Sequence, residues 1–152
     1  MTVKRRVDSP YYAESEVKID NFDNGCDVIS ALGVRKNYYL EKLRDIYTLD
    51  GAEVVFDTYP GLPPYIEIEG VSEEKVDAIA TLIGLTKSNP RDRRAREMYF
   101  DLYGVTKDRV LTDLTFNTVM DSLVPLATHD KDAFVARAKI QARTANSLRR
   151  TA

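Results

Sequence analysis

The chain has 152 residues, of which 43% are hydrophobic and 30% charged, a balance typical of a single soluble domain that buries a moderate core. The formal net charge of −2 is too small to indicate by itself a nucleic-acid or membrane partner. Cys26 is the only cysteine and His129 the only histidine, so within one chain a disulfide, a Cys/His zinc site and a Cys/His catalytic pair are excluded, and a bound metal would need oxygen ligands. No apolar stretch approaches the roughly 20 residues that cross a bilayer. The charged start Met1–Arg6 lacks the apolar segment of a secretion signal. We therefore expect a cytoplasmic protein with no membrane partner.

The first half of the chain has the alternating or β-rich patterns that are typical of strands. These patterns occur over Thr2–Val7, Tyr11–Ile19, Tyr38–Leu49 and a hairpin with its turn over Ala52–Glu69. They predict an antiparallel sheet of at least five strands. Two short amphipathic helices are expected beside it, one over Asp23–Leu32 and one from Ser72 as N-cap to Gly84. Because a Glu-x-Glu strand precedes each helix, we interpret the two passages as a pseudo-repeat with approximate twofold symmetry.

From Ser88 onward the composition turns helical. A helix that starts at Asn89-Pro90 is expected to end at Gly104, and a shorter apolar-faced piece is expected around Val119–Leu123. The last helix is expected over Asp130–Leu148, and its remaining face is basic through Arg137, Lys139, Arg143, Arg149 and Arg150. Because no aromatic side chains alternate with these charges, as base stacking would require, we interpret them as a solvated face and expect no nucleic-acid partner. The predicted fold class is α+β, with helices flanking the sheet and a helical C-terminal extension over residues 87–152.

The predicted hairpin ends in two carboxylates that point the same way. Pro60-Gly61 supplies the backbone angles of a tight turn, and Pro63-Pro64 holds the returning arm extended. Side chains alternate along a strand, so Tyr65, Glu67 and Glu69 share one face, with the two carboxylates roughly 6.5 to 7 Å apart. At that separation the two carboxylates can share a divalent cation.

Charged residues occur at i and i+2, and therefore on one face, in four of the predicted strands. The basic pairs are Lys4 with Arg6 and Lys42 with Arg44, and the acidic pairs are Glu14 with Glu16, followed by Lys18, and Glu67 with Glu69. If these rows face a common space, the cations can bind phosphate oxygens while the carboxylates hold a magnesium or manganese ion. The alternative is a wet outer sheet face on which opposite charges pair across strands. Closure of the sheet into a barrel would favour the binding site, because so many buried charges need a ligand or metal.

The stretch from Leu40 to Gly70 resembles the CYTH family, also called triphosphate tunnel metalloenzymes. The resemblance is carried by Glu41-Lys42-Leu43-Arg44, Tyr47, the Asp50-Gly51 turn, Phe56-Asp57, Pro60-Gly61-Leu62 and Ile66-Glu67-Ile68-Glu69. The upstream Thr2-Val3-Lys4 and Glu14-x-Glu16 fit the preceding strands of that family, so that the resemblance covers about residues 1–86. It implies a cytoplasmic antiparallel barrel that forms a tunnel and binds a nucleotide or inorganic triphosphate with Mg²⁺ or Mn²⁺.

Carried over residue by residue, the resemblance gives roles to charged side chains in this sequence. Lys4, Lys42 and Arg44 would contact phosphate oxygens, and Glu67 and Glu69 would hold the metal. Asp57 is a further metal candidate, with the alternative that it accepts backbone hydrogen bonds near the turn. The residues Glu14, Glu16 and Lys18 match the opening Glu-x-Glu-x-Lys signature of the family. Their neighbours match its mid-chain strand instead, and we favour that assignment. Glu14 and Glu16 are candidates for metal binding, and Lys18 is a candidate for phosphate binding.

The chain departs from the family pattern at its start. Family members have a signature strand, a helix and two more strands before the segment that resembles Thr2-Val3-Lys4, where this chain has only Met1. Three alternatives follow: the chain is a fragment or late-start product, a second copy or a complementing N-terminal polypeptide supplies the missing strands, or the domain has lost catalysis. An open edge at the Thr2 strand would favour pairing with another chain, so self-association is expected.

Three functions are consistent with these residues. The first is a metal-dependent triphosphatase, in which the cations position the triphosphate and the metal polarises a phosphoryl oxygen for attack by water. The second is cyclisation of ATP, as in class IV adenylate cyclases, which no residue in the sequence distinguishes from hydrolysis. The third is a catalytically inactive triphosphate-binding or assembly module built on an incomplete tunnel.

Overall fold

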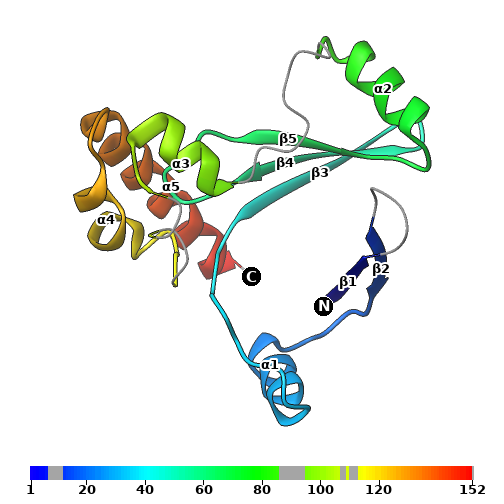
Figure 1. Ribbon diagram of the computed structural model, residues 1–152, viewed down its shortest axis with the longest axis horizontal. Coiled ribbons are helices and arrows are strands. Elements are labelled where there is room, and N and C mark those ends of the chain that lie inside the picture. The colour runs from blue at the N-terminus through cyan, green and yellow to red at the C-terminus, as the bar shows by residue number, and fades with distance from the viewer. Residues whose placement is uncertain (7–11, 86–94, 107–108, 110–112, 152) are drawn as a thin grey trace. The chain divides into compact units, whose positions relative to one another are not determined.

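The computed structural model describes residues 1–6, 12–85, 95–106, 109 and 113–151, and it confirms the α+β class (Figure 1). The chain divides into two compact units, Met1–Asn37 and Tyr38–Ala152, and each is described here by itself. No helix in the described ranges is both long and apolar enough to cross a membrane.

The first unit consists of a two-stranded antiparallel hairpin and one helix. Strand β1 (Thr2–Arg6) pairs with β2 (Tyr12–Glu16), and Lys4 lies opposite Glu14. Strand β2 ends at Glu16 and not at Ile19 as expected, so Lys18 follows the strand instead of extending its charged row. Helix α1 (Phe22–Ala31) matches the expected helix to within a residue at each end, and the Asn21 side chain caps it by accepting a hydrogen bond from the backbone N–H of Asn24 at 2.9 Å. The expected strand ends at Val7 and Tyr11 lie outside the described residues.

The second unit contains a three-stranded antiparallel sheet in the order β3-β4-β5. Strand β3 (Leu43–Leu49) turns into β4 (Ala52–Thr58) through Asp50 and Gly51, whose φ angles of 48° and 76° suit a tight hairpin. Strand β5 (Tyr65–Glu69) pairs with β4, which confirms the hairpin predicted over Ala52–Glu69. The described strands thus form sheets of two and three strands, and not the single sheet that the patterns predicted.

The segment before β3 is not a strand of this sheet, although the sequence predicted one from Tyr38. Leu40 instead forms an isolated parallel bridge with Leu114: the Leu114 N–H donates to the Tyr39 carbonyl at 2.8 Å, and the Glu41 N–H donates to the Leu114 carbonyl at 3.0 Å. A partner from a distant part of the chain therefore replaces the sheet contact that the local pattern suggested.

One face of the three-stranded sheet is covered near its β3–β4 turn by helix α2 (Glu73–Leu82). Ser72 caps α2 as predicted, with its side chain accepting from the Lys75 N–H at 3.3 Å. Ile79 of α2 packs on Ala52 and Val54, with Leu49, Phe56, Ile68 and Ile83 around them. The opposite face of the sheet carries Arg44, Asp57, Glu67 and Glu69.

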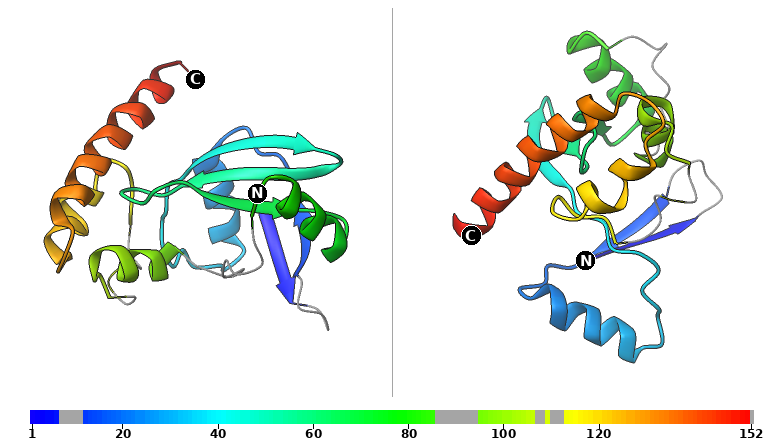
Figure 2. Two further views of the ribbon diagram at one scale, coloured as in Figure 1. Left: turned by 90° about the horizontal axis from the view of Figure 1, so that it is seen from above. Right: turned by 90° about the vertical axis from the view of Figure 1, so that its left-hand side faces the viewer.

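The C-terminal helices gather at the other end of this sheet, where β4 is joined to β5 (Figures 1 and 2). They are α3 (Ala95–Tyr103), α4 (Val119–Ser122), the 3-10 turn η2 (Val124–Leu126) and α5 (Lys131–Thr151). The expected start of α3 at Asn89-Pro90 lies outside the described residues. These helices bury Tyr99, Tyr103 and Phe134 together with Leu62 from the turn after β4. The compact units divide at Asn37, and the domain boundary expected after residue 86 stays a prediction.

Candidate functional site

A buried carboxylate, Asp57, lies at the centre of the candidate site. Its side chain is 0% exposed, and it is surrounded by two cations that the sequence placed on one face. The Lys42 Nζ lies 2.7 Å from Oδ2 of Asp57, while Arg44 donates from Nε to Oδ1 at 2.7 Å and from Nη2 to Oδ2 at 2.6 Å. Arg44 thus binds Asp57 through two parallel hydrogen bonds, the strongest geometry available to this pair.

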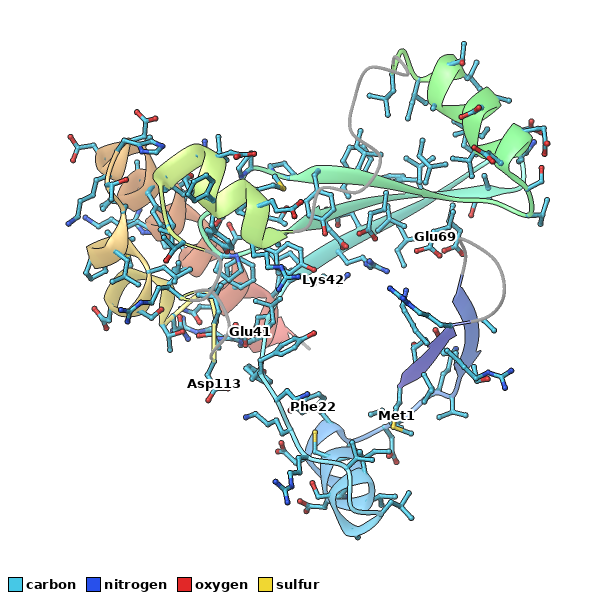
Figure 3. The ribbon with its side chains drawn as sticks, viewed as in Figure 1. Met1, Phe22, Glu41, Lys42, Glu69 and Asp113 are labelled. Atoms are coloured by element: carbon cyan, nitrogen blue, oxygen red, sulfur yellow. The ribbon has the colours of Figure 1, made fainter. Side chains whose placement is uncertain are left out.

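The register of the sheet explains why these side chains meet. Arg44 lies opposite Asp57, and Asp57 lies opposite Tyr65, so all three project from the same face. Glu67 and Glu69 follow Tyr65 at intervals of two residues and share that face. Figure 3 shows Lys42 and Glu69 on the side of the sheet away from α2. We call this set the charged face; it consists of Lys42, Arg44, Asp57, Tyr65, Glu67 and Glu69.

Glu67 is joined to the same cluster through Arg44. The Nη2 atom of Arg44 lies 3.0 Å from Oε2 of Glu67, and the Tyr65 hydroxyl donates to Oε1 of Glu67 at 3.3 Å. The Glu67 side chain is 39% exposed, and Glu69 is exposed beyond it. Lys42 and Arg44 therefore meet at Asp57, and Arg44 also meets Glu67, while the side chains of Lys42, Arg44 and Glu67 stay accessible from solvent. A common space shared by the charged rows stays a prediction.

The structure gives Asp57 contacts that neither interpretation drawn from the sequence included. Its oxygens accept hydrogen bonds from two cationic side chains, so in this structure it orients Lys42 and Arg44. Among the residues that the structure describes, no three or more His, Cys, Asp or Glu side chains gather into a group that could hold a metal ion. Glu67 and Glu69 share a face as predicted, and metal binding by these two, or by Asp57, stays a prediction.

The electrostatics of the charged face shift the pKa values of Asp57, Arg44 and Tyr65. Burial alone would raise the pKa of Asp57, but the hydrogen bonds from Arg44 and Lys42, together with their charges, outweigh burial and lower it. The hydrogen bond to Asp57 raises the pKa of Arg44 further above its already high value, against the effect of burial. Burial, helped by a hydrogen bond with Tyr59 and by the charges of Glu67 and Asp57, raises the pKa of Tyr65. Asp57 is therefore an anion, Arg44 a cation and Tyr65 a neutral donor.

The remaining site candidates lie in the first unit. Lys4 and Glu14 are directly opposite each other in the β1–β2 pair, and Glu16 lies opposite Thr2, whose hydroxyl donates to Oε2 of Glu16 at 3.1 Å. The register therefore puts Thr2, Lys4 and Glu16 on one face of that hairpin. Exposed Lys18 lies beyond the strand end. Their proposed meeting with Lys42 or Glu67 stays a prediction.

Side chains of the C-terminal helices hold the turn that joins the two strands of the site. The amide of Gln141 is buried; its Oε1 accepts from the Gly61 N–H at 2.6 Å, and its Nε2 donates to the Leu62 carbonyl at 2.7 Å. The hydroxyls of Tyr99 and Tyr103 donate to the carbonyls of Pro60 and Gly61 at 2.5 and 2.6 Å. No pattern in the sequence marked Gln141 for this role. These contacts fix the ends of β4 and β5, next to Asp57 and Tyr65.

Comparisons with protein-family models, with curated proteins and with solved structures found no match for this chain.

Proposed function

We propose that the charged face binds a triphosphate together with a divalent cation, Mg²⁺ or Mn²⁺. The observation that supports this proposal is the convergence of Lys42 and Arg44 on Asp57, with Arg44 also 3.0 Å from Glu67, on one open sheet face. In the proposal, Lys42 and Arg44 contact phosphate oxygens, and Glu67 and Glu69 hold the cation. The three-stranded sheet would be one wall of a tunnel-like barrel.

The charge of this face makes the metal essential to the proposal. The face carries three carboxylates and two cations, Lys42 and Arg44. Asp57 already binds both cations. A bare triphosphate would therefore meet a net negative surface. A divalent cation at Glu67 and Glu69 would offset that charge and supply coordination positions for phosphate oxygens, the arrangement that Mg²⁺ favours in phosphoryl-transfer sites.

Asp57 has a defined part in this proposal. It holds Arg44 by two hydrogen bonds, so the guanidinium keeps its orientation when Glu67 turns from Arg44 to a metal ion. The site is then preorganised for a tetrahedral phosphate before the ligand arrives. In hydrolysis, the cation would polarise a phosphoryl oxygen while water attacks the terminal phosphorus, and Lys42 and Arg44 would stabilise the developing charge.

Isothermal titration calorimetry with inorganic tripolyphosphate tests the proposal. We expect binding in the presence of Mn²⁺ and none in its absence, because the metal offsets the carboxylates. Glu67→Gln and Lys42→Gln should each weaken binding about tenfold or more. Asp45→Asn is the matched control, since Asp45 is an exposed carboxylate on the other face of the same sheet. Equal affinity in wild type and Glu67→Gln, or no binding by wild type with Mn²⁺, would refute the proposal.

Product analysis separates the chemical outcomes that the proposal allows. Incubation with ATP and Mn²⁺ should release orthophosphate if water is the nucleophile. A cyclic nucleotide with pyrophosphate would instead identify cyclisation of ATP. Binding without either product would identify a triphosphate-binding module without catalysis.

A further inference from the structure

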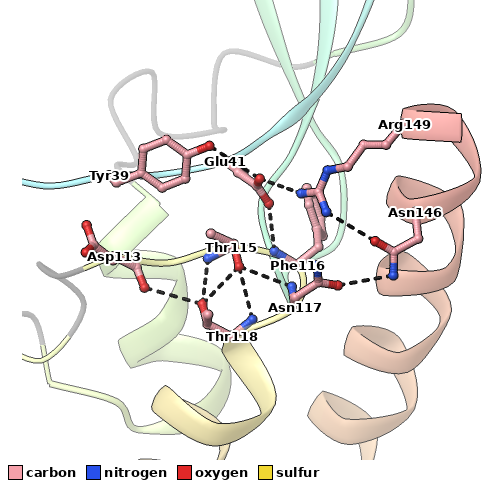
Figure 4. Close-up of polar contacts among 9 residues, drawn as sticks. All are labelled: Tyr39, Glu41, Asp113, Thr115, Phe116, Asn117, Thr118, Asn146 and Arg149. Atoms are coloured by element: carbon pink, nitrogen blue, oxygen red, sulfur yellow. Dashed lines mark hydrogen bonds and ion pairs between the residues drawn. The ribbon is translucent and has the colours of Figure 1, made fainter. Parts of the chain in front are cut away.

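Glu41, the residue before Lys42, joins the charged face to the C-terminal helix. Its carboxylate is 19% exposed and contacts α5, the segment around Phe116 and the nearby Tyr39 (Figure 4). Oε1 accepts from the Arg149 guanidinium at 2.5 Å and from the Tyr39 hydroxyl at 3.4 Å, and Oε2 accepts from the Phe116 N–H at 3.1 Å. No role was expected for Glu41 beyond its place in the Glu-Lys-Leu-Arg motif.

The backbone around Glu41 is fixed as firmly as its side chain. The bridge between Leu40 and Leu114 holds both the Tyr39 carbonyl and the Glu41 N–H. Lys42 is the next residue, and it reaches Asp57 at 2.7 Å. Because one peptide unit separates the two residues, a shift of Glu41 moves the start of the Lys42 side chain with it.

Arg149 is held in turn by its own helix. Its Nη1 donates to Oδ1 of Asn146 at 3.1 Å, and Nδ2 of Asn146 donates to Oδ1 of Asn117 at 3.2 Å, so the end of α5 is tied to the segment that follows Leu114 (Figure 4). The Arg149 side chain is 45% exposed. Ion pairs at such exposed positions contribute little to global stability, so breaking this one should leave the protein folded.

We propose that Glu41 and Arg149 are positioning residues for phosphate binding, which act through Lys42. The pair connects α5 to the residue whose ammonium group is expected to contact the ligand, and a displaced contact group loses affinity steeply. This inference rests on the proposed function of the charged face. It adds that the C-terminal helix tunes the affinity of that face.

The test is a double-mutant cycle on the full chain, with tripolyphosphate and saturating Mn²⁺ as the probe. Arg149→Gln and Glu41→Gln, which break the ion pair from either side, should each weaken binding about threefold to tenfold. Arg149→Lys, which keeps the charge, should recover part of that loss. In a Lys42→Gln background, Arg149→Gln should have no further effect, because the side chain through which it acts is gone; a purely structural role would not produce this pattern.

Arg143→Gln serves as the control, because Arg143 is an exposed arginine on the same helix. Urea unfolding of each variant checks that the fold is kept. If wild type binds and Arg149→Gln binds equally well, or if the Arg149→Gln effect persists without Lys42, the positioning role is overturned while the proposed function stands. If wild type with Mn²⁺ does not bind tripolyphosphate, both are overturned.

Discussion

Asp57 is the residue on which the charged face depends, because it is a fully buried carboxylate with two cationic partners. Asp57→Asn keeps the shape but removes the negative charge that Lys42 and Arg44 share. We expect the free energy of unfolding at pH 7 to fall by about 2 kcal/mol, since the lost hydrogen bonds are charge-assisted while the partners are one-third exposed and regain some solvation. Asp45→Asn should change it by less than about 0.5 kcal/mol. Urea denaturation measures both, and equal effects would show that Asp57 does not hold the cluster together.

The effect of Asp57→Asn on stability should depend on pH. The pKa of Asp57 is lower in the folded protein than in the unfolded chain. The ionised Asp57 therefore stabilises the fold fully when the pH is above its pKa in the unfolded chain, about 3.9, and this stabilisation is lost as the pH falls through its pKa in the folded protein. The stability difference between wild type and Asp57→Asn should therefore be constant near neutral pH and shrink below about pH 4. Urea midpoints measured from pH 7 to pH 3 test this, and a difference that grows on acidification would contradict it.

Among the elements, the turn between β4 and β5 packs against the core formed by the C-terminal helices. Gly61 has a φ of 83°, and a Cβ added there would collide with the ring of Phe134, which is itself stacked on Tyr103 with ring centroids 4.0 Å apart. Gly61→Ala should destabilise the protein by more than about 3 kcal/mol, because a left-handed backbone penalty adds to a clash that the buried ring cannot relieve.

Gly51→Ala is the matched control for this turn. Its φ of 76° is similar, but nothing lies within 4 Å of the added Cβ, so only the backbone penalty of about 1 to 2 kcal/mol is expected. Thermal or urea unfolding gives both values. Equal losses at the two glycines would mean that the turn is not packed against α5 as described.

At the scale of the whole molecule, the elements set by local pattern could be predicted and the long-range partners could not. The β4–β5 hairpin, the Ser72 cap and the shared face of Glu67 and Glu69 follow from nearby residues. Gln141 accepts a hydrogen bond from the backbone of Gly61, 80 positions away in the sequence. Leu114 forms a bridge with Leu40 in place of the strand partner that the pattern predicted. Sequence periodicity does not encode such contacts. Asp57 lies opposite Arg44 across the β3–β4 hairpin, so its register follows from nearby residues, whereas its burial and its two cationic partners do not show in the pattern.

The division of the chain gives a prediction about fragments. Residues 38–152 hold the three-stranded sheet and the helices that bury Leu62, so this fragment should unfold cooperatively by itself. Residues 1–86 lack Phe134 and Tyr99, which cover that turn, and should not. Circular dichroism during urea titration of both fragments measures this, and a cooperative transition in residues 1–86 alone would support a boundary after residue 86 instead.

Locating the metal shows whether the charged face binds a metal–triphosphate complex. Nuclear magnetic resonance of the ¹⁵N-labelled chain with tripolyphosphate and substoichiometric Mn²⁺ would reveal it through paramagnetic broadening of nearby amide signals. We predict that broadening is strongest around Glu67, Glu69 and Arg44, and that Glu67→Gln abolishes it while Asp45→Asn does not. Broadening centred elsewhere on the chain, or broadening unchanged in Glu67→Gln, would contradict the account.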